Sequence, residues 1–300
     1  MSHLPFTLLA YFFNALSVLT SKFLLNRTIP NPLVYIFFIS LFSLLAILAL
    51  PFTKIPSVEV FTLASFSTLL WTLGAYFMFR ALKIGDVARV IPIIGTLIPL
   101  ILLIFASKTH EVSNLQTWAI WFLITGMVFL TLPDWRFKLN IGEITFEVAS
   151  AILFAVSYII LREAYLKFDF FSVLVWSRPI LLPLGIILFL VPTFRRQIFS
   201  ASLSLSPSRG GSIKSGLVFI GGQLSGALSE LLILFSISLA NPALVNSLQG
   251  VQYVFLLFFG FILSKKYPAI FQEKYTPMIL LSKAAGIALL GAGLYLLAFS

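Results

Sequence analysis

The chain has 300 residues, of which 60% are hydrophobic and only 10% are charged, and its formal net charge is +10. A water-soluble domain carries about a quarter charged residues, so this composition, with a mean hydropathy of +1.06, excludes an ordinary globular protein. The basic residues fall mostly between apolar segments, which favours a role in membrane orientation over nucleic-acid binding. The absence of cysteine excludes disulfides and thiolate metal sites.

Apolar segments of membrane-spanning length recur along nearly the whole chain. About 20 helical residues cross the ~30 Å hydrocarbon core. In chain order the predicted spans are Leu4–Leu25, Pro32–Leu50, Ser57–Phe79, Asp86–Ala106, Asn114–Leu132, Glu143–Leu161, Phe170–Val191, Gly216–Leu239, Pro242–Leu263 and Pro277–Phe299. The pattern predicts an all-α integral membrane protein with ten transmembrane helices and no room for a soluble domain.

Several of these segments carry helix start signals. Three have a capping side chain directly before a proline, which is favoured at the first helical position: Asn31, Asn241 and Thr276. Three more have candidate caps: Ser57, Asp86 and Asn114. The first span lacks a basic leader and a small-residue cleavage site, so we expect a retained helix and no signal peptide. The longest link, about 193–215, is Ser-rich and basic, and we expect a flexible loop that faces anionic lipid.

The basic residues of the links are distributed unevenly between the two sides of the membrane. Links on the N-terminal side carry Lys54, Lys108, Arg162 and Lys167, whereas those on the opposite side carry fourteen Lys and Arg. The positive-inside rule therefore predicts that both termini lie outside. In the first half the basic links follow helices one and three, and in the second half they follow helices two and four. Equivalent links thus face opposite sides, as five crossings per repeat require.

The two halves also align with each other. With Ser107-Lys108 placed on Ser264-Lys265, Ala81-Leu82 falls on Ser238-Leu239 without a gap. The register further pairs Gly126 with Gly293, Ala119 with Gly286, Ser17 with Ser157 and Lys22 with Arg162. We therefore predict two inverted five-helix repeats, residues 1–139 and 140–300.

With these duplicated halves, an Ala-Leu-Lys turn at Ala81–Lys83 and a closing helix with Gly286 and Gly293, the chain resembles EamA-type transporters of the drug/metabolite transporter superfamily over essentially its whole length. It departs from them in two ways. The acidic residue that usually follows the fourth helix of each repeat is displaced to Glu111 in the first half and is replaced by Lys265-Lys266 in the second. The family also commonly keeps its termini in the cytoplasm, whereas the charge distribution here predicts that they lie outside. The resemblance implies alternating-access transport, with export favoured, in the plasma or inner membrane.

Two opposite charges lie inside predicted spans. An ionisable group there costs about 2.5–3.5 kcal/mol on insertion scales and marks a functional candidate. Arg178 lies eight residues into span seven and Glu230 nine residues before the end of span eight, so both lie ~12–14 Å below the same face, where we expect them to meet. Arg178 could clamp a carboxylate while Glu230 takes an amine or a coupling proton; the alternative is a structural ion pair.

Span nine has a polar face at helical spacing, formed by Asn246, Gln249, Gln252 and Tyr253. Its counterparts in span four are Arg89, Pro92, Gly95 and Thr96. Two symmetry-related polar faces predict a cavity at the repeat interface; hydrogen bonding between buried amides is the alternative. Pro92 and Pro99 are candidate kink points.

Weaker candidates for the solute path are Asn14, Trp71 and Tyr76, because aromatic side chains at helical spacing also serve packing or the interfacial belt. Lys283 lies near a span end and is expected to snorkel to the interface. Glu147, one turn after a helix start, is expected to serve as an entrance or capping residue.

Small residues predict close helix packing. They occur at Gly222 and Gly226 in span eight and at Ala284, Ala288 and Ala292 in span ten. Such faces pack either within one subunit or between subunits, so the sequence is compatible with a homodimer formed through spans five and ten.

The sequence contains no residue pattern typical of an enzyme active site. The histidines, His3 and His110, lie in a tail and a loop, and no His-Glu-x-x-His pair is present for zinc. Asp86, Asp134 and Asp169 lie at span edges, and no phosphate-binding Gly-x-x-x-x-Gly-Lys-Ser/Thr loop occurs. We therefore expect neither an enzyme nor a bound cofactor or metal.

These features together predict a multi-pass secondary carrier for a small polar metabolite, an amino acid or related carboxylate, with that solute and membrane lipids as its partners and no nucleic acid. Three alternatives stay open. They are a non-transporting membrane protein, a lipid scramblase of the same architecture, and a carrier of nucleotide sugars or lipid-linked sugars.

Overall fold

The computed structural model describes residues 3–27, 31–85, 87–109, 112–131, 141–205, 213–264 and 277–298. The regular elements in these ranges are all helices. In chain order they are α1 (Leu4–Arg27), α2 (Pro32–Ser43), the 3₁₀ helix η1 (Leu44–Phe52), α3 (Val58–Ile84), α4 (Val87–Thr109), α5 (Asn114–Thr131), α6 (Ile141–Lys167), α7 (Phe170–Trp176), α8 (Leu181–Leu190), α9 (Pro192–Leu205), α10 (Ile213–Leu239), α11 (Pro242–Ser247), α12 (Gly250–Ser264) and α13 (Pro277–Ala298).

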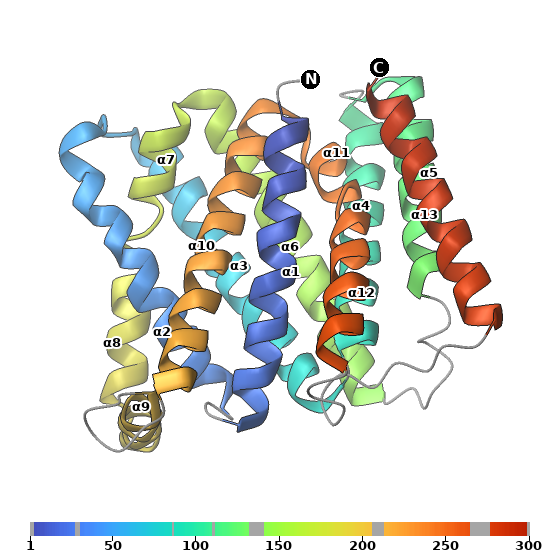
Figure 1. Cartoon of the computed structure of the whole chain (residues 1–300). Helices are drawn as coiled ribbons and strands as arrows, with labels where there is room; N and C mark the ends of the chain where they lie inside the picture. Colours follow the sequence, from blue (N-terminus) through green and yellow to red (C-terminus); the bar gives the residue numbers. More distant parts are fainter. Residues whose placement is uncertain are drawn as a thin grey trace.

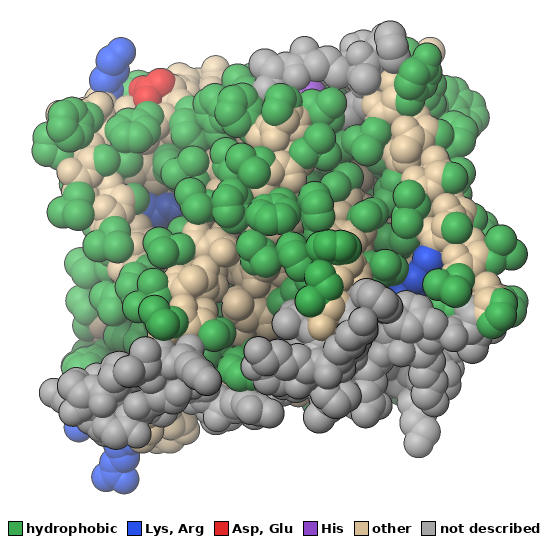
Figure 2. Space-filling view, in the orientation of Figure 1, with side chains coloured by type: hydrophobic (Ala, Val, Ile, Leu, Met, Phe, Trp, Pro, Cys, Tyr) green, Lys and Arg blue, Asp and Glu red, His purple; other side chains and the backbone are tan. Residues whose placement is uncertain are grey.

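The helices have the length and surface of a membrane protein. Eight segments of the described chain are long and apolar enough to cross a membrane, and two shorter apolar helices cover Val90–Ala106 and Asn114–Leu130. Both termini lie at one end of the bundle (Figure 1), and large apolar side chains cover the face in Figure 2. The chain is therefore an all-helical, multi-pass membrane protein.

Side-chain caps begin several helices where the sequence predicts them. Asn31 accepts a hydrogen bond from the Leu33 amide at 2.9 Å, Asn241 from the Ala243 amide at 2.8 Å and Ser57 from the Val60 amide at 3.3 Å. The predicted cap at Asn114 is wrong. Ser113 and Gln116 instead form a reciprocal capping box there, with bonds of 3.1 and 3.2 Å. The predicted caps Thr276 and Asp86 lie outside the described residues.

Three predicted spans are not continuous α-helices. In span two, α2 passes into the 3₁₀ helix η1 after Ser43, and in span nine a turn at Leu248 and Gln249 separates α11 from α12. In span seven, α7 and α8 are separated by residues 177–180. Pro179 explains this last break, because proline has no N–H to donate and its ring clashes with the carbonyl one turn earlier. The break places Arg178 in a turn inside the span.

The predicted flexible loop after span seven is wrong in its first part, because Pro192–Leu205 forms the helix α9. Phe194, Ile198 and Ala201 lie one helical turn apart on its inner face, and the last two are buried. Arg195 and Arg196 are exposed. The helix lies across the end of the bundle opposite the termini and is seen end-on in Figure 1. It is an amphipathic helix packed against α2, α8 and α10.

The largest interfaces each join a helix of the first half to one of the second: α1 packs against α10, α3 against α6 and α5 against α13. Small and hydroxyl side chains allow the close approach. Ser67 and Ser157 each donate to the other's backbone carbonyl, at 2.9 and 3.0 Å. The two halves therefore share one core.

The predicted packing role of Gly222 and Gly226 is confirmed. A Cβ at Gly222 would collide with Thr20, and one at Gly226 would lie 2.8 Å from Ser17 Oγ, so both glycines face α1 of the same chain. Ala284 and Ala288 point to the exposed side of α13. The glycine face of α13 instead packs on α5 within the chain.

Candidate functional site

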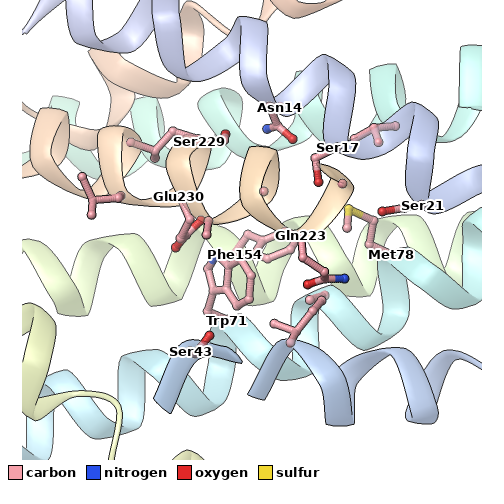
Figure 3. A pocket seen from close by; sticks show the side chains of 18 of the residues that line it. Asn14, Ser17, Ser21, Ser43, Trp71, Met78, Phe154, Gln223, Ser229 and Glu230 are labelled. Carbon is pink, nitrogen blue, oxygen red and sulfur yellow. The ribbon is translucent and has the colours of Figure 1, made fainter. Parts of the chain in front are cut away.

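A cavity of about 440 Å³ lies among helices from both halves of the chain. Small-molecule sites typically measure about 300–1,000 Å³, so this space suits a metabolite. Figure 3 shows side chains from several helices converging on it. Seven of the ten residues predicted to bind a solute line it: Asn14, Trp71, Arg178, Glu230, Asn246, Gln249 and Gln252.

Arg178 and Glu230 share the cavity without touching. Arg178 comes from the break between α7 and α8 and is 9% exposed, while Glu230 extends from α10 into the space. Both side chains line the same cavity. Within the described chain, however, no salt bridge or hydrogen bond joins them, so the expectation of direct contact is wrong. The structural ion pair is absent, and both charged groups face the cavity.

The polar face of span nine points into the protein, as predicted. Asn246, Gln249 and Gln252 are 2, 8 and 0% exposed. Asn246 Nδ2 donates to the Pro242 carbonyl at 2.9 Å, and Gln249 Nε2 lies 3.4 Å from Gln252 Oε1. Gln252 Nε2 is buried and has no hydrogen-bond partner among the described residues. Since an unmet buried donor costs about 1–3 kcal/mol, this amide is suited to a ligand.

Tyr253 lies outside the cavity lining because it binds α4. Its hydroxyl donates to the Ile91 carbonyl at 3.0 Å, and a Cβ on Gly95 would collide with that hydroxyl. Glycine at this position therefore lets α12 approach α4.

The predicted polar wall from span four is wrong. The residues of α4 that line the cavity are Ile91, Ile94 and Ile98, while Thr96 is buried elsewhere in the protein. The side chain of Arg89 lies outside the described residues. This wall is apolar because isoleucines face the cavity, while Gly95 of the same helix faces Tyr253 of α12.

The remaining sequence candidates divide between the cavity and the periphery. Trp71 lies in the cavity, with its ring 5.7 Å from that of Phe154 in an edge-to-face arrangement. Tyr76 does not line the cavity, and its hydroxyl accepts a hydrogen bond from Arg80 at 3.2 Å. Glu147 and Lys283 are buried in the protein but lie outside the cavity lining.

Sequence reasoning missed several polar residues of the lining. Ser17 and Ser21 follow Asn14 on one face of α1, and Gln223 lies two turns before Glu230 on α10. Figure 3 shows Gln223 and Glu230 projecting from α10 on the same side. The signal was present, because polar side chains at three-, four- and seven-residue spacing inside an apolar span share a face.

Comparison with known proteins identifies the fold alone. No family model and no curated protein matches the chain. A solved structure described only as "Crystal structure of protein" has 15% sequence identity and a TM-score of 0.61, over 98% of this chain and 96% of its own. The two chains therefore share their fold over nearly their whole length.

Proposed function

We propose that the protein is a secondary transporter of the cell membrane, with ten spans in two inverted EamA-like repeats, that moves a small carboxylate or zwitterion such as an amino acid by alternating access. Export is the direction that the family resemblance favours. The observation that carries the proposal is the cavity between the halves, which Arg178 and Glu230 both line, and among the described residues no salt bridge joins them.

The pattern of helix neighbours supports the inverted repeat. If spans one to five correspond to spans six to ten, the α1–α10 interface corresponds to the α3–α6 interface, and α1–α12 corresponds to α4–α6. The α5–α13, α2–α8 and α4–α11 interfaces each map onto themselves. A pseudo-two-fold axis in the membrane plane produces this arrangement.

Two equivalent basic residues support the same register. Lys22 Nζ donates to the Leu82 and Gly85 carbonyls at 2.8 and 2.6 Å, at the end of α3. Arg162 Nη1 donates to the Ile237 and Ser238 carbonyls at 2.7 and 2.8 Å, at the end of α10. A cation at a helix C-terminus binds carbonyls that have no partner within the helix. Each repeat thus ties its first helix to the end of its third.

The last helices of the repeats exchange equivalent contacts. A Cβ on Gly126 would lie 2.9 Å from the Gly286 carbonyl, and one on Gly293 would lie 3.0 Å from the Ala119 carbonyl. The sequence register pairs Gly126 with Gly293 and Ala119 with Gly286, so the two contacts are related by the repeat.

The broken spans support a transport site. Transporters often bind solutes near the midplane, where discontinuous helices expose backbone groups and helix ends. Here Arg178 and Gln249 occupy the breaks of spans seven and nine, and both line the cavity. A guanidinium so placed can bind a carboxylate bidentately, while the Glu230 carboxylate can accept an ammonium group.

Solute flux into vesicles that contain the purified protein tests the proposal. We expect saturable amino-acid flux, and a half-saturation concentration that rises about tenfold to hundredfold in Arg178→Ala, because a charge-assisted hydrogen bond contributes about 1.5–3 kcal/mol. Glu230→Gln is expected to weaken flux of zwitterions more than that of simple carboxylates. Arg195→Ala, which removes an exposed cation on α9, is the matched control.

Two outcomes would contradict the proposal. Full activity in both Arg178→Ala and Glu230→Gln would remove the pair from the path. Movement of fluorescent phospholipid between leaflets, without solute flux, would indicate the lipid scramblase instead.

A further inference from the structure

The cavity is open on its side, toward the surface that faces lipid. Three apolar residues of its lining, Phe42, Leu45 and Leu231, are also 39, 61 and 45% exposed. They belong to α2, η1 and α10. Figure 2 shows a basic side chain recessed among the hydrophobic ones on this face.

The opening lies beside the change of helix type in span two. The Phe38 and Phe42 rings of α2 pack on Phe219 of α10, with centroids 5.3 and 6.0 Å apart. After Ser43 the chain continues as η1, which packs against α7 and α2 and contains no buried residue. The main described packing of η1 is thus on α7 and α2, whereas α10 packs on α2. Leu45 of η1 and Leu231 of α10 both line the cavity and are exposed.

The opening lies at the depth of the charged pair. Leu45 precedes Phe52, the end of η1, by seven residues, or ~14 Å at the 3₁₀ rise. Leu231 precedes the end of α10 by eight residues, or ~12 Å. Since the hydrocarbon core is ~30 Å thick, the opening faces the acyl chains near the midplane.

The cavity has one polar and one apolar wall. The polar wall comprises Asn14, Gln223, Glu230 and the amides of α11 and α12, whereas α4 presents Ile91, Ile94 and Ile98. The large exposed residues that border the opening, Phe42, Leu45 and Leu231, are apolar, and Ser43 is the small polar residue beside them. A purely polar solute would face hydrocarbon through this gap, but an apolar chain could lie in it without leaving a lipid-like environment.

We propose that the transported solute is an amphiphile with a single short apolar chain, whose carboxylate or zwitterionic headgroup binds between Arg178 and Glu230 while its chain extends through the opening between η1 and α10 into the bilayer. This inference rests on the proposed transport function. It adds that the solute carries an apolar chain, and that this chain stays in lipid by passing through the opening.

Quenching of tryptophan fluorescence tests whether lipid reaches the cavity. Trp71 lines it, and replacing the other four tryptophans by Phe leaves Trp71 as the only fluorophore of this kind. In vesicles of phospholipid brominated on the acyl chains, we expect Trp71 to lose at least half the fraction of emission that a Trp121-only variant loses, since Trp121 is 46% exposed. Ala227→Phe, at an exposed lining position, is expected to reduce that quenching at least twofold.

Leu228→Phe is the matched control, because Leu228 is 46% exposed and is not part of the lining. It is expected to leave quenching unchanged. Trp71 emission that brominated lipid does not alter, or quenching equal in Ala227→Phe and Leu228→Phe, would overturn the lateral opening. Because this readout needs no solute, it remains valid if the protein transports nothing.

A series of straight-chain 2-amino acids, from 2-aminobutanoate to 2-aminooctanoate, tests the solute class. Burial of one methylene is expected to tighten binding about fourfold, measured by thermal stabilisation of the wild-type protein. An affinity that is constant or falls with chain length, or no binding at any length, would overturn the amphiphile. A flat series together with flux that depends on Arg178 would reject this inference and leave the transport proposal standing.

Discussion

The packing of α13 on α5 predicts opposite effects for two identical substitutions in one helix. A Cβ on Gly286 would lie 2.7 Å from the Leu130 amide nitrogen and 2.8 Å from the Gly126 carbonyl oxygen. Both are backbone atoms of α5, so neither can move without the helix. A Cβ on Gly291 would meet nothing within 4 Å. Gly286→Ala and Gly291→Ala therefore differ only in the contact that the methyl group makes.

The magnitudes follow from the balance of helix propensity and packing. In a helix interior Ala is favoured over Gly by about 0.8–1.0 kcal/mol, which should appear in full for Gly291→Ala. Gly286→Ala gains the same amount but must separate two helices, and overpacking typically costs about 1–3 kcal/mol. We therefore expect Gly291→Ala to stabilise by about 1 kcal/mol and Gly286→Ala to destabilise by up to about 2 kcal/mol.

Thermal unfolding of the two variants and the wild type, in the same detergent and followed by circular dichroism, measures the difference. The midpoint should rise for Gly291→Ala and fall for Gly286→Ala. Equal shifts of the two midpoints would refute the close approach of α5 and α13. Gly221→Ala offers a second control on another helix, since a Cβ there also meets nothing within 4 Å.

Three further predictions concern polar groups inside the bundle. Gln252→Leu should raise the unfolding free energy of the ligand-free protein, because the buried amide without a hydrogen-bond partner costs about 1–3 kcal/mol. It should also lower the affinity for the solute. A variant in which stability and affinity both rise or both fall would contradict this. Lys22→Met should lower the unfolding free energy by about 2–3 kcal/mol through loss of two bonds to α3 carbonyls, whereas Lys54→Met, at an exposed position, should change it by less than about 0.5 kcal/mol. Tyr253→Phe should lower the free energy of unfolding, measured by thermal unfolding, by about 1 kcal/mol, because the hydrogen bond to the Ile91 carbonyl is lost. An unchanged free energy of unfolding would show that this hydrogen bond does not stabilise the folded protein.

The sequence was informative where one physical requirement dominates. Crossing hydrocarbon requires a long apolar segment that is mostly helical, and for this reason eight predicted spans recur as long apolar segments of the described chain, three of them with a break in the α-helix. Capping is equally local, so Asn31, Asn241 and Ser57 could be assigned from their neighbours. Asn114 failed because Ser113, one residue earlier, has Gln116 at the right distance to complete a capping box.

The interior of the spans was harder to predict, because hydropathy averages over a break. Pro179 beside Arg178 was a visible signal for the turn inside span seven. No comparable residue marks the passage from α2 to η1, where Ser43 and Leu44 are unremarkable in sequence. The helix α9 was hidden by its serines, although Phe194, Ile198 and Ala201 keep an amphipathic spacing.

Depth and periodicity together located most of the candidate site. Arg178 and Glu230 were predicted at the same depth, and both line the cavity. Whether they would touch depends on helix separation, which spacing along one helix does not encode. The same limit explains α4, where the polarity of Thr96 did not reveal that Ile91, Ile94 and Ile98 face the cavity.

The asymmetry between the proposed repeats bears on how a bound solute is oriented. In span nine the lining is Asn246, Gln249 and Gln252, while in span four, its proposed counterpart, the lining is isoleucine. If both repeats carried the same lining, a solute could bind in either of two orientations related by the pseudo-two-fold axis. Because the two linings differ, each orientation has a different energy, since reversing an amphiphile would move its charge from the amides toward Ile94. Under the proposed alternating-access mechanism, the headgroup of the solute would therefore stay on the same side of the cavity while the openings exchange.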